Sequence, residues 1–65
     1  MNVTRTITQY WLKDWRGARY ATAVVLQSGD LRKVVRFSQK LNRETAERQT
    51  DCLMRIMEKR NENPG

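Results

Sequence analysis

Arg32 and Arg36 are the two side chains of this sequence best placed to do chemistry, and that chemistry is the binding of anions. They lie four residues apart in segment 31–38, a β-branched run that reads as a strand. Residues at this spacing share one face of a strand and are separated by roughly 13 Å. Arginine forms paired hydrogen bonds with phosphate groups and guanine edges. The pattern therefore predicts a cationic sheet face, and its alternative is a solvated face whose charges protect a sheet edge.

Further cations and aromatic residues stand in the neighbouring segments. We expect the nearby cations to contact phosphates, and they are Arg16, Arg19, Lys33 and Lys40. The candidate aromatic contacts are Tyr10, Trp11 and Trp15. Trp15 lies in a predicted turn, where it could cover one end of the core or stand exposed beside the arginines, ready to stack on a base or a partner side chain.

The sequence contains few of the residue types and motifs that catalysis requires. The sequence has no histidine, one cysteine, no glycine-rich phosphate loop and no serine-centred elbow. These features predict a protein that is not an enzyme and that holds no cofactor or metal. Cys52 cannot form an internal disulfide, and we expect it to be buried on a helix flank. No apolar run approaches about 18 residues, so we expect a cytoplasmic protein with no membrane contact.

The strongest structural signal is a β-hairpin over residues 20–38, with Ser28, Gly29 and Asp30 at its turn. Leu31, Val35 and Phe37 share one face of its second strand. Both faces of the first strand, residues 20–26, are fairly apolar, which is typical of a central strand. Its small Ala21 and Ala23 would lie either under a helix or on an open face near a ligand.

Residues 3–13 predict an N-terminal strand with Val3 and Ile7 facing inward. The alternation falters near Gln9, which indicates either a bulge or a stretch covered on both faces. A turn follows over residues 14–19, and Gly17 is its expected positive-φ position.

A helix is predicted over residues 43–61, because the segment lacks Gly and Pro and is rich in helix formers. Ser38 or Asn42 would cap its N-terminus. Met54 would lie off the buried stripe, exposed or at a dimer contact. The expected stripe comprises Ala46, Gln49, Leu53, Ile56, Met57 and Arg60.

These elements predict an α+β fold, a three-stranded antiparallel meander followed by one C-terminal helix packed on one face (βββα). Residues 1–61 would form a single domain and 62–65 a frayed polar tail. At 65 residues the core is small, and homodimerisation is one way to bury more surface.

The net charge of +6 and the pI near 10.3 favour an anionic partner. Residues 1–40 hold eight cations and two anions, whereas residues 41–65 hold five of each. The excess therefore belongs to the predicted sheet. This distribution argues against a recognition helix and favours binding through the sheet.

The order of three strands and one helix, with Phe37 ending the third strand and Glu44-Thr45-Ala46-Glu47 in the helix, resembles the arm-type DNA-binding domains of phage integrases and the related AP2 domains of plants. The resemblance covers element order and a few positions between Tyr20 and Ile56, and it is a fold-level analogy. It implies a sheet that enters the DNA major groove. The link from Phe37 to the helix is longer here.

Two functions follow as hypotheses. The first is a small basic nucleic-acid-binding module, with duplex DNA favoured, such as an accessory or regulatory factor of a mobile element. The second is a protein-interaction module, an inhibitor or adaptor that docks on an acidic protein surface through aromatic and basic residues. Steep salt dependence would mark the first, and dependence on tryptophan the second.

Overall fold

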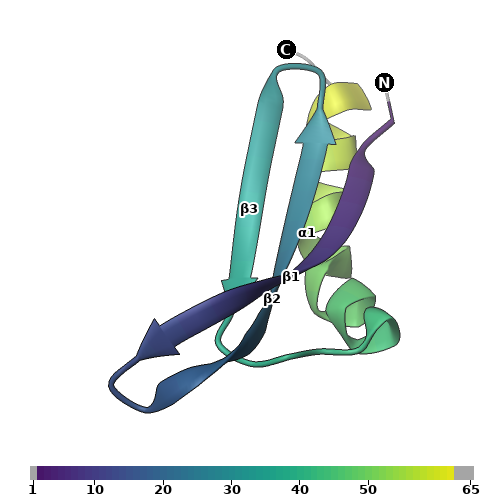
Figure 1. The fold of residues 1–65 in the computed structure, drawn as a ribbon. Helices are drawn as coiled ribbons and strands as arrows, with labels where there is room; N and C mark the ends of the chain where they lie inside the picture. Colours follow the sequence, from purple (N-terminus) through teal and green to yellow (C-terminus); the bar gives the residue numbers. More distant parts are fainter. Residues whose placement is uncertain (1, 63–65) are drawn as a thin grey trace.

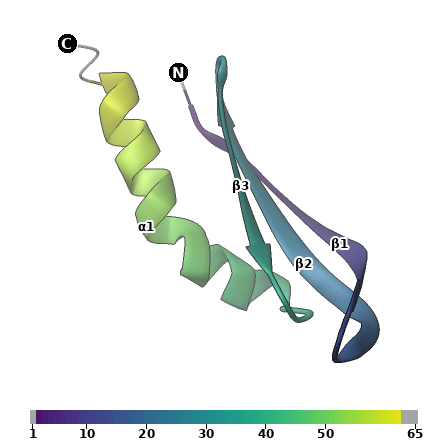
Figure 2. The same cartoon turned by 90° about the vertical axis from the view of Figure 1, so that its left-hand side faces the viewer.

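The computed structural model describes residues 2–62, which form three strands and one helix. The strands are β1 (Thr4–Asp14), β2 (Gly17–Ser28) and β3 (Leu31–Phe37), and the helix is α1 (Arg43–Glu62). The strands pair antiparallel in the order β1-β2-β3, and α1 packs on one face of the sheet (Figure 1; Figure 2). The predicted βββα fold is confirmed.

Each hairpin turn uses one glycine with a positive φ, as the sequence predicted. Gly29 (φ 58°) and Asp30 link β2 to β3, with the glycine at the first central position as in type II′ turns. Gly17 (φ 114°) closes the other turn after Trp15 and Arg16, neither of which has a positive φ. That turn is shorter than the predicted segment 14–19, because β1 continues to Asp14 and β2 begins at Gly17.

The strand β1 pairs with β2 without interruption, from Thr4 opposite Gln27 to Asp14 opposite Gly17. Neither explanation for the faltering alternation near Gln9 is therefore correct. There is no bulge, and the strand is not covered on both faces beyond that point. Instead, the less exposed side of β1 changes at Gln9: before it Arg5 and Ile7 are half-buried toward α1, and after it Tyr10 and Leu12 are half-buried on the opposite face.

The core lies between β2 and α1, and the helix packs mainly against that central strand. Val3, Val24, Leu26, Ala46 and Met57 are buried there. Partly buried side chains surround this cluster, namely Ile7, Leu31, Phe37, Leu41, Leu53 and Met54. The inward positions predicted for Val3 and Ile7 are confirmed.

The helix α1 begins with Asn42 as its N-cap, since the Asn42 Oδ1 accepts a hydrogen bond from the Thr45 backbone N–H at 2.7 Å. Ser38, the other candidate, lies outside the helix. The segment just before α1 is held against the sheet, because the Leu41 N–H donates a hydrogen bond to the buried Thr22 hydroxyl at 2.8 Å. Residues 63–65 of the predicted tail lie outside the described residues, and Glu62 belongs to the helix.

The buried stripe of α1 is rotated from the predicted one. Thr50 is buried and Met54 packs against the core, whereas Gln49 and Ile56 are exposed. The sheet packs on a different side of α1 from the predicted stripe. The prediction that Met54 lies off the buried side of the helix was therefore wrong. Cys52 is exposed rather than buried.

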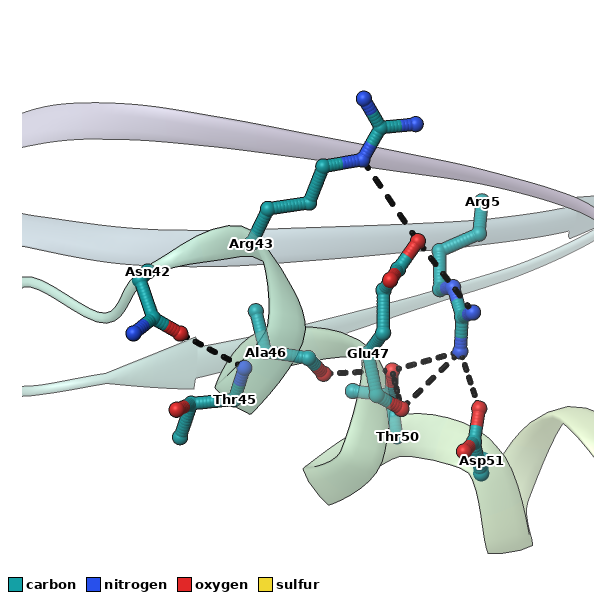
Figure 3. Close-up of polar contacts among 8 residues, drawn as sticks. All are labelled: Arg5, Asn42, Arg43, Thr45, Ala46, Glu47, Thr50 and Asp51. Carbon is teal, nitrogen blue, oxygen red and sulfur yellow. Dashed lines mark hydrogen bonds and ion pairs between the residues drawn. The ribbon is translucent and has the colours of Figure 1, made fainter.

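A cluster around Arg5 ties β1 to α1 (Figure 3). The Arg5 guanidinium donates to the Asp51 carboxylate at 2.7 Å, to the Glu47 carbonyl at 3.1 Å and to the Thr50 hydroxyl at 3.3 Å. Glu47 also pairs with Arg43 at 3.6 Å. Arg5 therefore faces the helix, and its charge is matched by acids of α1.

Candidate nucleic-acid interface

The sheet face opposite α1 is uncovered in Figure 2, and we call it the open face. Directly opposite residues of neighbouring strands share a face. The pairing therefore assigns to the open face three cross-strand rows that run from β1 through β2 to β3. They are Thr4–Gln27–Arg32, Thr6–Val25–Val34 and Thr8–Ala23–Arg36.

A shallow hollow of about 360 Å³ lies on the open face. Ala23 and Val25 of β2 line its middle, because their side chains are shorter than those beside them. Tyr10 borders it on β1, and the two arginines border it on β3. Ala21 and Ala23 lie on the open face and not under α1, and a ligand close to them stays a prediction.

Arg32 and Arg36 are exposed on the open face, and neither forms a hydrogen bond or ion pair with another described residue. Val34 lies between them on the same face and is 45% exposed. The three strands contain one acid, Asp14, at the far end of β1. The two guanidinium groups are therefore free to bind an anion, and no acid on their own strands competes for them.

The other predicted cations do not share this arrangement. Lys33 is exposed but lies opposite Leu26, on the side of the sheet that faces α1. Lys40 is exposed in the segment between β3 and α1. Arg16 and Arg19 both contact Asp14, and the Arg19 guanidinium donates to both of its carboxylate oxygens at 3.0 and 2.9 Å.

This pairing changes the electrostatics of the β1–β2 turn. Chiefly through the hydrogen bonds from Arg19, the pKa of the Asp14 carboxyl lies well below its ordinary value. Arg19 also donates to the Ser38 carbonyl at 2.7 Å. Arg19 is therefore largely occupied within the chain, and Arg16 retains more freedom to contact a ligand.

The predicted aromatic contacts separate into two groups. Tyr10 is half-buried on the open face, where its hydroxyl donates to the Phe37 carbonyl at 3.4 Å. Trp11 and Trp15 are exposed, so Trp15 is not a lid on the core. Tyr20, which was not among the predicted contacts, is exposed and packs edge-on against Trp11. Counting the register back from a turn at Trp15 and Arg16 would have paired these two rings.

Searches against known families, curated proteins and solved structures found no match to this chain. Among the described residues, no helix is both long and apolar enough to span a bilayer. Among the side chains that the structure describes, those of residues 2–60, no three or more acids or cysteines are arranged to hold a metal ion.

Proposed function

We propose that this chain is a small nucleic-acid-binding module that binds duplex DNA through its open face. The observation that supports this most directly is the pair Arg32 and Arg36, exposed and unpartnered on an uncovered sheet. Residues 41–65 hold as many cations as anions, so the net positive charge arises from residues 1–40, which include the sheet. On the open face, Arg32 and Arg36 have no acid beside them on β3, and this favours phosphate binding there.

The dimensions of the open face suit the DNA major groove. Two strand spacings of roughly 4.8 Å separate β1 from β3, so the backbone sheet is about 10 Å wide. The groove is about 12 Å wide and admits a two-stranded β-ribbon, such as the pair of β2 and β3, of which β3 carries both arginines. Arg32 and Arg36 can reach guanine edges or phosphates, and the row Thr6–Val25–Val34 between them offers methyl groups suited to thymine.

Binding of duplex DNA through one face of the sheet fits an accessory or regulatory factor that acts on DNA in the cytoplasm. The analogy with the arm-type domains of integrases supports a mobile-element origin for such a factor. In this proposal α1 stabilises the sheet and makes no base contacts.

The test is a salt titration of binding to a generic fluorescein-labelled duplex, followed by anisotropy. The variant Arg32→Gln, Arg36→Gln is compared with Arg55→Gln, Lys59→Gln, which removes the same charge from exposed, unpartnered positions on α1. If both open-face arginines contact phosphates, the slope of log K against log salt should fall in magnitude by about 1.8 in the first variant only.

Two results would reject the proposal. One is an absence of duplex binding even at about 50 mM salt, where phosphate contacts are strong. The other is an equal loss in both variants, because binding would then follow the net charge rather than the open face. Circular dichroism of both variants checks that the fold is retained.

A second candidate function is docking on an acidic protein surface, as an inhibitor or adaptor. The observation that favours it is the exposure of Trp11 and Trp15. Tryptophan is enriched among the residues that contribute most of the binding energy at protein interfaces. Such binding would depend on the tryptophans and change little with salt. A pull-down with the Trp15→Ala variant as control would detect it, and sedimentation of the free protein would detect a homodimer.

A further inference from the structure

The hairpin formed by residues 10–21 extends beyond the rest of the fold, and we call it the arm. The strand β3 pairs with β2 only from Thr22 onward, so the arm has two strands where the body of the sheet has three. Figure 1 shows this end of β1 and β2 projecting away from β3 and α1. The helix α1 does not cover the arm, and a two-stranded ribbon is too small to build a core of its own.

The arm nevertheless carries three large exposed aromatic side chains. Trp15 is 90% exposed, Trp11 is 60% exposed and Tyr20 is 57% exposed. Burial in the core, which usually explains such residues, does not apply to them. Exposed aromatic residues gathered on one projecting element indicate a binding surface.

The rings form two separate platforms. Trp11 and Tyr20 pack edge to face, with centroids 5.0 Å apart and planes at 77°, so each ring restrains the other. Trp15 stands at the turn, with the Arg16 guanidinium 5.5 Å from the centre of its ring. Trp15 comes four positions after Trp11 and directly follows the end of β1, so the strand rise gives a separation of at most about 13 Å along the chain. This spacing suits several flat ligand groups in succession better than one continuous apolar contact.

The charges of the arm complement a phosphate backbone. Its cations are Lys13, Arg16 and Arg19, and its one acid, Asp14, is bound by Arg19 at 2.9 Å. Lys13 and Arg16 are exposed beside the aromatic platforms. Cations next to aromatic faces are the combination by which proteins bind single strands, with phosphates on the cations and bases stacked on the rings.

We propose that the arm binds unpaired nucleotides of single-stranded nucleic acid. Trp15 forms one stacking platform and Trp11 with Tyr20 forms the other, while Lys13 and Arg16 contact the phosphates between them. This site is separate from the open face. A chain with both surfaces would suit a duplex that continues into a single strand.

The test uses the intrinsic fluorescence of the protein, because its two tryptophans both lie in the arm. The probe is an oligothymidylate of about 12 nucleotides, within the range that single-strand-binding folds cover. Stacking of thymine on the indole rings should quench the emission. An abasic strand of the same length keeps the phosphates but lacks the bases, so it should bind weakly and quench little.

Variants then locate the contact. Trp15→Leu should weaken binding of the oligothymidylate by roughly 5- to 150-fold, the loss expected for one stacked base. Trp11→Leu should act similarly, and anisotropy of labelled strands follows both variants independently of their emission. The variant Arg32→Gln, Arg36→Gln should keep the quenching, because its changes lie outside the arm.

Three other results would each overturn the proposal. Equal binding of the abasic strand without quenching would mean that the arm attracts phosphates only. If the oligothymidylate does not bind even at low salt, the arm is not a nucleic-acid site, and an acidic protein surface becomes the favoured partner. Duplex binding that depends on Arg32 and Arg36, without any quenching by single strands, would reject the arm site and preserve the open-face proposal.

Discussion

Replacing Arg5 by methionine should destabilise the fold without weakening duplex binding. Arg5 is 17% exposed and joins β1 to α1 through Asp51, Glu47 and the Thr50 hydroxyl (Figure 3). The Arg5→Met variant keeps much of the aliphatic stem and removes the guanidinium. Since this side chain faces the helix rather than the open face, its loss should affect stability alone.

The magnitude follows from the exposure of the partners. A hydrogen bond to a charged group contributes about 1.5–3 kcal/mol when both partners are buried. Here the side chains of Asp51 and Glu47 are 48% and 38% exposed, so water replaces much of what the arginine supplied. We therefore expect a loss of about 1–2 kcal/mol in the free energy of unfolding. For a domain of this size, that lowers Tm by roughly 5–15 °C.

Thermal unfolding followed by far-UV circular dichroism measures this change. The control is Arg48→Met, which breaks the exposed Arg48–Glu44 pair on the same helix and should cost at most about 0.5 kcal/mol. A double-mutant cycle with Asp51→Asn isolates the coupling between Arg5 and Asp51. A Tm change no larger than that of the control would refute the assigned role of Arg5, as would a parallel loss of duplex binding.

Two further predictions concern single side chains. Asn42→Ala removes the N-cap and should lower the free energy of unfolding by about 1 kcal/mol. Ser38→Ala is the control and should change it little. Chemical unfolding measures both variants, and an equal effect would contradict the assigned cap. Since the folded-state pKa of Asp14 lies below its unfolded value near 3.9, its stabilising contribution is complete above about pH 5 and is lost as the pH falls below 4. Asp14→Asn should therefore flatten the fall of Tm with acidification, and an unchanged pH profile would argue against the Asp14–Arg19 pair.

The fold was largely predictable because its pairings are local. Gly17 and Gly29 mark two tight turns, and strands joined by such turns pair with their neighbours in the chain. The helix face was not predictable to the same accuracy. Met54 and Ile56 are both apolar, and only the position of the sheet determines which of them is buried.

The candidate site shows a similar division. Period-2 alternation placed Arg32 and Arg36 together on one face, as the strand pairing shows. Counting charges by sequence segment did not show which cations are free to bind a ligand, because Arg5 is matched by acids of α1 and Arg19 by Asp14. These pairs join residues that are distant in sequence or lie across a turn, so composition could not show them. The exposure of Tyr20 depended on which part of the sheet α1 covers, and the bounds of the helix in the sequence do not determine that.

The length of the arm can change without disturbing the core. The buried cluster lies between α1 and the part of the sheet from Thr22 onward, so residues 10–21 could be extended or shortened independently. Adding two residues to each strand would move Trp15 outward by about 7 Å and keep every side chain on its present face. Adding one residue to each would turn the tip over relative to the body. Related chains could therefore differ in reach by steps of two residues in each strand while keeping the same body.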